Sequence, residues 1–439
     1  MQQDIFLPDF TERPYWLTSL PPLPETPPAV PPPSADVVVV GAGLSGLAVA
    51  HDLAAAGRDV AVLEAGTPGE GASSRNAGML GRNTKHSFLG LQAAAGLDAA
   101  KAHFSDLGAV LRECLARIEA DTLDCALQRN GRLMLAITQR QLDGFKREYE
   151  ARQAHAGEES IFLDRAAVSA EIGSESYVGG VMLPDNAAIH AGAYTRAFLR
   201  RAEAAGATVI GDCPARAIRR ESAGFAVKTD RGVILARDVV ICTNGYGGGL
   251  VPWARRRLIA MDSYIVATEP LPPAILAGLL PGNRSYMDGN QRPVSMRLSS
   301  DGTRLLFGSR TGERPGRLRR TAAMVHADMV RIFPQLRAIR LANAWGGRCA
   351  LTWDYFPHVG KHDGIHYCLG YNFSGMAMAP HLAGIVADEL LGRRKSTSRF
   401  ATRPFPRALW PARAFDSAAT RQVIRYYGNR DRRRIARES

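Results

Sequence analysis

A glycine-rich turn between an apolar strand and a helix constrains the fold of this chain more than any other feature. Residues 36–46 read DVVVVGAGLSG, so four valines lead directly into Gly41, Gly43 and Gly46. Such a turn lets the backbone approach a pyrophosphate and lets the next helix, expected at Leu47–Ala56, pack closely on the sheet. The amide groups at the N-terminus of that helix would face the phosphates. The pattern predicts an α/β domain that binds a dinucleotide.

An acidic residue completes this pattern. Glu64 ends the strand 59–64, 18 residues after Gly46, where a carboxylate can accept hydrogen bonds from both ribose hydroxyls. The same carboxylate would repel a 2′-phosphate, which argues against NADP. We expect the turn residues Leu44, Ser45 and Ala65 to line the same site.

The chain beyond Glu64 favours FAD over a nicotinamide cofactor. Residues 66–78 are rich in glycine and other small residues, and they run into an Arg-Asn pair. Such a loop can wrap a long, extended cofactor, whereas a nicotinamide domain would normally continue directly into its next helix. The expected donors to the diphosphate and the flavin end are Ser73, Ser74, Arg75 and Asn76.

A second glycine-rich turn lies near the other end of the chain. Residues 370–375 begin and end with glycine and precede an apolar helix expected at Leu382–Leu391. A reduced flavin carries negative charge near its N1 and C2 oxygen, and a helix N-terminus stabilises such charge. The expected flavin contacts here are Gly370, Ser374, Gly375 and Met376.

Several of these stretches together resemble the D-amino-acid-oxidase-type FAD oxidoreductases, and among them the group around γ-glutamylputrescine oxidase. The similarity covers about residues 10–395 and is carried by segments 13–17, 71–78, 239–245, 345–347, 352–360 and 370–375. It implies FAD as the cofactor and an α/β fold, with a Rossmann-like FAD-binding domain interleaved with an α+β substrate domain. The expected cofactor site therefore also includes Ala215, Thr243, Asn244 and Gly245.

The domain boundaries follow from the order of these motifs. We expect the FAD-binding domain at 34–88, 160–250 and 345–395, and the substrate domain, with an antiparallel or mixed sheet plus helices, at 89–159 and 251–344. The proline-rich arm 1–33 is expected to lie on the surface as a stiff spacer, and the basic tail 396–439 has no assignable pattern. The expected helices are 96–121, 139–158, 193–205 and 322–333, and the expected strands are 208–210, 215–219, 225–229, 233–236, 239–245, 263–268, 294–298 and 304–308.

The amino-acid composition limits the classes of partner that this protein can bind. The net charge is +13, but no RNA-binding module or aromatic platform accompanies it, so solvated basic surface is favoured over nucleic-acid binding. A basic field can still attract anionic substrates, an acidic acceptor protein or a membrane surface. No apolar run of 18 residues or secretory signal occurs, and the six cysteines are scattered without zinc spacing. We therefore expect a cytoplasmic enzyme without an integral membrane segment or a metal.

The expected reaction is oxidation of an amine or amino acid. The flavin takes up the hydride that leaves the substrate carbon. The protein therefore has only to orient the amine and exclude water. The resulting imine is hydrolysed, and oxygen is reduced to hydrogen peroxide. One alternative replaces oxygen by a quinone or a carrier protein, and a remote one is a flavin-dependent RNA-modifying or RNA-binding protein. The candidate catalytic residues are Tyr264 and Arg297 on substrate-domain strands, Arg348 at the domain junction and Tyr371 as part of an apolar lid.

Cys349 is a candidate for covalent attachment of the flavin. It lies in a Cys-x-x-Thr stretch with Thr352, similar to the stretch that carries the flavin-linked cysteine in the monomeric sarcosine oxidases. The resemblance implies a thiol beside the dimethylbenzene edge of the ring, where an 8α-thioether can form. The alternative is a cysteine that acts only as a small apolar residue. The sequence leaves the exact substrate, the acceptor and the oligomeric state open.

Overall fold

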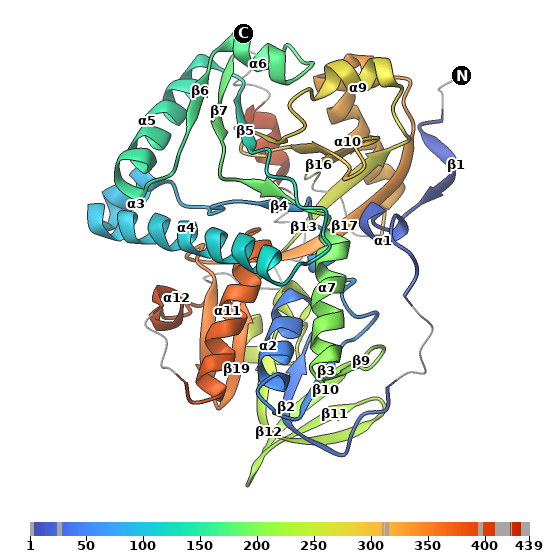
Figure 1. Cartoon of the computed structure of the whole chain (residues 1–439), viewed down its shortest axis with the longest axis vertical. Helices are drawn as coiled ribbons and strands as arrows, with labels where there is room; N and C mark the ends of the chain where they lie inside the picture. Colours follow the sequence, from blue (N-terminus) through green and yellow to red (C-terminus); the bar gives the residue numbers. More distant parts are fainter. Residues whose placement is uncertain are drawn as a thin grey trace.

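The computed structural model describes residues 4–23, 29–309, 311, 316–393, 398–408, 422 and 424–431. The chain forms two large sheets, with helices packed on them and a layer of helices between them (Figure 1). Within the described ranges, every helix is too short or too polar to span a lipid bilayer.

The eight-stranded sheet carries the first glycine-rich turn. Its central strands run parallel, and β2 (Ser34–Val40) contributes four valines of which none is more than 5% exposed, as expected for a strand covered on both faces. The helices α2 (Leu44–Ala54), α7 (Ala191–Ala204) and α11 (Gly375–Leu390) lie beside this sheet (Figure 1). The strand order is β10 (Ala215–Glu221), β11 (Gly224–Thr229), β12 (Gly232–Ile241), β2 (Ser34–Val40), β3 (Val60–Leu63) and β9 (Thr208–Ile210), with β19 (Ile365–Leu369) paired to β12 and β18 (His358–His362) paired to β19.

The nine-stranded sheet is mixed. Its strands are antiparallel except for two parallel pairs, β1 with β17 and β14 with β5. Helices α10 (Leu318–Ile332) and α9 (Pro273–Leu279) contribute to the core on one of its faces. The order is β1 (Phe6–Thr11), β17 (Leu341–Thr352), β13 (Leu258–Thr268), β16 (Leu305–Ser309), β15 (Ser295–Leu298), β14 (Ser285–Asp288), β5 (Arg132–Ala136), β7 (Gly179–Leu183) and β6 (Ile161–Leu163).

The long helix α4 (Leu97–Ala120) crosses the middle of the molecule between the two sheets (Figure 1). It contacts α11 on one side and α5 (Gln139–Ala156) on the other. Its apolar face, including Phe104, Leu107 and Leu111, joins the core that surrounds α2. The remaining elements are α1 (Tyr15–Thr18), η1 (Ala72–Ser74), β4 (Met79–Leu80), α3 (Phe88–Ala95), α6 (Arg165–Glu171), β8 (Ala187–Ala188), η2 (Asn244–Tyr246), α8 (Pro252–Arg255), η3 (Pro334–Leu336) and α12 (Arg399–Thr402).

The expected fold class is confirmed, but the start of the chain differs from expectation. Residues 1–33 were expected to be a surface spacer, yet β1 forms the edge of the nine-stranded sheet and Trp16 is fully buried. The Trp16 indole donates a hydrogen bond to the Asn76 carbonyl at 2.7 Å. Burial of this large aromatic surface stabilises the arm against the cofactor loop. Residues 24–28 of the arm and most of the tail lie outside the described residues.

Three expected boundaries also shift. The strands β6 and β7 pair in the nine-stranded sheet, so the expected nucleotide segment 160–250 divides after residue 183. Residues 233–236 and 239–241 form one strand, β12, because β11 and β2 pair with successive parts of it. Helix α11 begins at Gly375 rather than at Leu382. It includes Pro380, which has no backbone N–H and therefore removes one helical hydrogen bond.

Candidate active site

The first glycine turn leaves no room for side chains. Gly41 has φ +104°, a conformation that favours glycine, and a Cβ there would lie 3.0 Å from the Cys242 carbonyl oxygen. A Cβ on Gly46 would lie only 1.9 Å from the Gly41 carbonyl oxygen. Both glycines are therefore required for α2 to start directly at the end of β2.

The N-terminus of α2 fits a phosphate group. Gly43 is its N-cap and supplies no side chain to cap the helix. The Leu44 amide donates to the Ser73 hydroxyl at 3.0 Å, whereas the amides of Ser45 and Gly46 have no acceptor among the described residues. Free amides at the positive end of a helix are the donor set that a pyrophosphate needs.

Glu64 lies beside this helix terminus. One carboxylate oxygen accepts from the Ala42 amide at 2.8 Å, and the other accepts from the Gly66 amide at 3.3 Å. These bonds hold the carboxylate at the carboxyl end of β3 and leave further lone pairs for ribose hydroxyls. Ala65 follows it and is exposed, and Ala215, on the edge strand β10, is half-buried.

The loop 72–78 is held by its own side chains rather than presenting them freely. Asn76 donates to the carbonyls of Ala72 and Ser73 and accepts from the Gly78 amide, and the hydroxyl of Ser74 donates to the Gly69 carbonyl. These contacts turn the donors expected from Ser74 and Asn76 toward the loop backbone.

Arg75 ties the same loop to the nine-stranded sheet. Its guanidinium donates to the carbonyls of Glu70, at 2.7 Å, and Gly346, at 3.2 Å. The Trp345 indole donates back to the Arg75 carbonyl at 3.1 Å, and a Cβ on Gly347 would lie 3.0 Å from the Cβ of Arg75. The loop therefore packs directly against the backbone of strand β17.

The second turn is shaped by two asparagines. Asn244 accepts from the Gly370 amide at 3.0 Å, and Asn372, at φ +52°, accepts from the Thr352 amide at 2.9 Å. Ser374 is the N-cap of α11, but its hydroxyl donates to the Asn83 carbonyl at 2.9 Å instead of capping the helix. The N-terminal amides of α11, around Gly375, therefore receive no side-chain acceptor from Ser374.

The two glycine turns meet directly. The Tyr371 hydroxyl lies 2.5 Å from the Ser45 hydroxyl, although 326 residues separate the two in sequence. Tyr371 is only 6% exposed, and burial raises the pKa of its phenol well above the ordinary value. The ring of Tyr371 belongs to the core between α2 and α11, and its hydroxyl joins the two turns. Its expected place in an apolar lid stays a prediction.

The side chain of Arg297 is held by hydrogen bonds to the end of the cofactor loop and its neighbours. Its side chain is buried and donates to the carbonyls of Gly78, at 3.1 Å, and Ile189, at 2.8 Å, and to the side chain of Gln128 at 2.8 Å. Burial lowers its pKa to about 10, so the guanidinium stays charged at neutral pH. Arg297 holds the end of the cofactor loop rather than facing a pocket.

Strand alternation decides the position of Tyr264. Tyr264 and Val266 belong to the core that includes residues of α10, whereas Ile265 and Ala267 belong to the core shared with Trp345 and Tyr371. Tyr264 therefore shares a face of the sheet with Asp262 and Arg348, opposite to the face that meets the cofactor loop, and its expected contact with substrate stays a prediction.

Arg348 and Cys349 lie on β17 beside η2. The Arg348 guanidinium binds Asp262 on the neighbouring strand at 3.0 Å, and its amide donates to the Tyr246 hydroxyl at 3.0 Å. A Cβ on Gly245 would lie 3.0 Å from the Cys349 carbonyl oxygen. A cavity of about 180 Å³ is lined by Thr243, Asn244, Gly245 and Arg348 among others.

Cys349 shares a strand face with Gly347, two residues before it, and Gly347 faces Arg75. Its side chain thus projects toward the side of the sheet that carries the cofactor loop. Arg348 projects to the opposite side, next to Asp262. The structure therefore brings Cys349, but not the Arg348 side chain, to the face that meets the loop.

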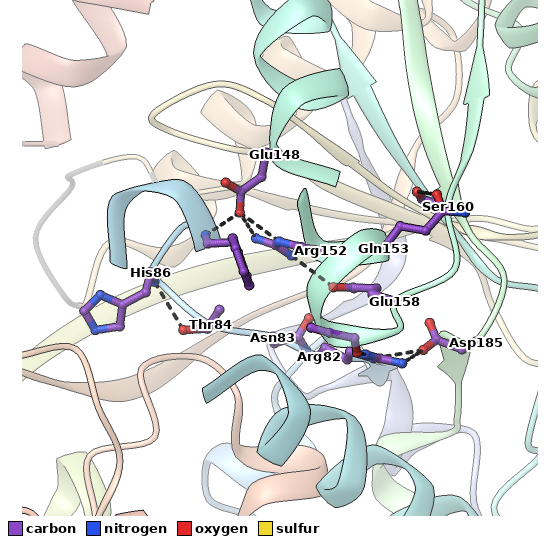
Figure 2. Close-up of polar contacts among 12 residues, drawn as sticks. Arg82, Asn83, Thr84, His86, Glu148, Arg152, Gln153, Glu158, Ser160 and Asp185 are labelled. Carbon is purple, nitrogen blue, oxygen red and sulfur yellow. Dashed lines mark hydrogen bonds and ion pairs between the residues drawn. The ribbon is translucent and has the colours of Figure 1, made fainter. Parts of the chain in front are cut away.

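A loop that the sequence did not single out supports the second turn. Asn83 accepts from Ser374, and the Lys85 ammonium lies 4.9 Å from the centre of the Phe373 ring. Figure 2 shows how this loop is anchored: Arg82 binds Asp185 at 3.0 Å, and Arg152 lies between the carboxylates of Glu148 and Glu158. No motif marks Arg82 and Asn83, because their partners Asp185 and Ser374 lie far away in sequence.

Comparisons with known proteins establish the family. Residues 36–389 match the family model of the DAO group, described as FAD dependent oxidoreductase. The chain belongs to this family. It is an FAD-dependent oxidoreductase, as the sequence predicts.

Individual relatives agree with this membership. The chain is 30% identical to gamma-glutamylputrescine oxidoreductase of Escherichia coli, covering 90% of this chain and 93% of the relative. It is 27% identical to a probable oxidoreductase OrdL of Haemophilus influenzae, covering 90% and 91%. The solved structure of glycine oxidase from Geobacillus kaustophilus is similar with a TM-score of 0.70 and 24% identity, covering 86% of this chain and all of that one, which supports the fold.

Proposed function

We propose that this enzyme oxidises the carbon–nitrogen bond of an amine or amino acid and uses oxygen as the acceptor. The observation that carries the proposal is the contact between Ser45 and Tyr371, which places two uncapped helix N-termini beside one another. The names of two relatives, gamma-glutamylputrescine oxidoreductase and glycine oxidase, support the substrate class.

We assign the cofactor contacts as follows. The amides of Ser45 and Gly46 bind the pyrophosphate, and Glu64 binds the ribose. The N-terminal amides of α11, at Gly375 and Met376, would hold the flavin at its pyrimidine side. When bound, FAD would accept a hydride, that is two electrons and one proton, from the substrate carbon.

The chain then has to orient the amine and exclude water. The substrate carbon loses hydride and the nitrogen loses a proton, which leaves an imine. Water hydrolyses the imine to a carbonyl compound and an amine or ammonia, and oxygen takes two electrons and two protons to give hydrogen peroxide. Arg348 is our candidate for a substrate carboxylate, because it lines the cavity beside Asn244 and Gly245.

The decisive experiment is anaerobic flavin bleaching by a panel of amines, N-methyl amino acids, D-amino acids and 2-hydroxy acids. Bleaching by an amine or amino acid, followed by peroxide formation when air is admitted, is the expected result. Bleaching by 2-hydroxy acids alone would contradict the assignment of the carbon–nitrogen bond. Bleaching by an amine with reoxidation by a quinone but not by oxygen would support the dehydrogenase alternative.

We also propose that Cys349 is positioned to hold the flavin covalently, because its side chain shares the face of β17 that meets the cofactor loop. Precipitation with trichloroacetic acid tests this. A yellow pellet, with an intact mass raised by one FAD and lost in Cys349→Ser, is the expected result. A colourless pellet with all flavin in the supernatant shows that Cys349 is only a neighbour of the ring.

A further inference from the structure

The loop that joins β4 to α3, residues 81–87, contacts the N-terminus of α11. The Asn83 carbonyl accepts a hydrogen bond from the Ser374 hydroxyl at 2.9 Å. Ser374 is the N-cap of α11, a position at which a serine hydroxyl usually accepts from the second or third amide of the helix. The Ser374 hydroxyl makes no such bond, and the amides of Gly375 and Met376 have no acceptor among the described residues.

The contact with Asn83 therefore selects one of two arrangements of the N-terminus of α11. With the Ser374 hydroxyl directed to Asn83, the first amides of the helix stay open to a ligand. With the hydroxyl turned back onto the helix, it would occupy the amide of Met376 or Ala377, and a ligand would have to displace it.

Asn83 is held in place by a buried arginine of the nine-stranded sheet. Arg132, on β5, is 4% exposed and donates to the side-chain oxygen of Asn83 and to the Leu80 carbonyl. The Asn83 amide donates to the Gly81 carbonyl at 2.7 Å, which closes the turn. The side chain of Asn83 is thus bound to the sheet, while its carbonyl is bound to Ser374.

The preceding residue fixes the loop from another side. Arg82 is 8% exposed, donates to the carbonyls of Ala156 and Gly157 at 2.9 and 3.0 Å, and binds Asp185 (Figure 2). A shift of the Asn83 carbonyl would therefore break buried hydrogen bonds of charged groups, which are costly to lose.

We propose that Asn83 is a positioning residue for the flavin. Held by Arg132, it draws the Ser374 hydroxyl away from α11 and keeps the first amides of this helix open to the pyrimidine ring. The proposal rests on the proposed function in one respect, namely that α11 faces the pyrimidine side of the flavin.

Sulfite titration of the oxidised, FAD-loaded enzyme tests the proposal. Sulfite adds to flavin N5 and leaves negative charge near N1 and the C2 oxygen, which open helix amides stabilise. Asn83→Ala removes the acceptor of Arg132 and should weaken sulfite binding by roughly fivefold or more. Asn83→Asp keeps an acceptor for Arg132 and should bind sulfite as the parent does. The double variant Asn83→Ala/Ser374→Ala has no hydroxyl to turn onto the helix, so it should also regain the parental affinity.

Thr84→Val is the matched control, because the Thr84 hydroxyl lies in the same loop but contacts His103. It should leave the sulfite affinity unchanged. Asn83→Ser takes the place of the alanine variant if that protein does not fold. The proposal is overturned if loss of the Asn83 amide leaves sulfite binding at the parental level. It is also overturned if the double variant binds as weakly as the single one, which would indicate general damage to the loop.

Ser374→Asp distinguishes this result from a wrong placement of α11. A carboxylate at this helix N-terminus should weaken sulfite binding if α11 faces the flavin. Parental binding in both Ser374→Asp and Asn83→Ala would mean that α11 lies elsewhere, whereas weak binding in Ser374→Asp alone would mean that only the role of Asn83 is wrong. The titration needs neither an amine nor oxygen, so its result does not depend on the proposed reaction.

Discussion

The first glycine turn and the nine-stranded sheet depend on the chain in different ways. At the turn, β2, the three glycines Gly41, Gly43 and Gly46, and α2 follow one another directly in the sequence. In the nine-stranded sheet, β1 pairs with β17 and β14 pairs with β5, so strands from distant parts of the chain lie side by side. Local sequence therefore marks the nucleotide end well, whereas the residues of the second sheet take their roles from partners that the sequence does not place.

The largest loss of FAD binding is expected at Gly46, where the backbone leaves no space for a side chain. Gly46→Val puts side-chain atoms where a Cβ already lies 1.9 Å from the Gly41 carbonyl oxygen, so α2 must shift away from β2. We expect FAD binding to weaken by at least about 4 kcal/mol, which gives a colourless or insoluble protein. Flavin content per chain after purification measures this.

Gly384→Ala is the matched control, because Gly384 lies in α11 and a Cβ there meets nothing within 4 Å. This variant should keep its flavin and gain a few tenths of a kcal/mol of stability from helix propensity. Equal flavin loss in both variants would mean that the close backbone packing at Gly46 is not what FAD binding requires.

The next effect concerns Arg297, which connects the nine-stranded sheet to the cofactor loop. Arg297→Met removes the buried guanidinium that donates to the Gly78 and Ile189 carbonyls; the Gly78 carbonyl keeps its bond from the Ile189 amide, whereas the Ile189 carbonyl loses its donor. We expect a loss of about 3 kcal/mol in the free energy of unfolding, measured by urea denaturation of the flavin-loaded protein. The exposed Arg337→Met should change it by less than about 0.5 kcal/mol. An Arg297→Met protein of parental stability but low activity would instead restore the catalytic role expected from sequence.

The layer between the sheets should respond to pH. Burial lowers the pKa of His103 on α4 to about 3, so this imidazole is neutral in the folded protein at pH 5, whereas it is protonated in the unfolded chain. The unfolded state then binds more protons, and stability falls as pH drops below about 6.5. His103→Gln should reduce the stability difference between pH 7 and pH 5 by about 2 kcal/mol, as followed by thermal unfolding at both values. An unchanged difference would show that His103 titrates normally.

The smallest effect is expected for Arg348. Its ion pair with Asp262 is partly exposed, with side chains 37% and 29% accessible, so Arg348→Ala should cost less than about 1 kcal/mol of stability. A double-mutant cycle with Asp262→Ala measures the coupling. A large drop in kcat/KM at nearly unchanged stability supports Arg348 as the group that binds a substrate carboxylate, and unchanged kinetics argues against it.

The sequence by itself determined the glycine turn before α2, the acid at the end of β3, the second turn before α11 and hence the family and the cofactor. These features depend on residues within a few positions of each other, because φ angles and close backbone approach are local properties. The long helices α4, α5, α7 and α10 were also expected from their local patterning, close to their observed bounds.

Only the tertiary structure decided where the side chains of Arg297, Tyr264 and Tyr371 lie, and that the arm around Trp16 belongs to the core. A strand side chain faces one side or the other according to register, and the register between β13 and β17 joins segments that lie far apart in the chain. A buried polar group likewise binds whichever partner the fold brings to it. Sequence patterns carry no record of such distant partners, so these assignments had to come from the packed structure.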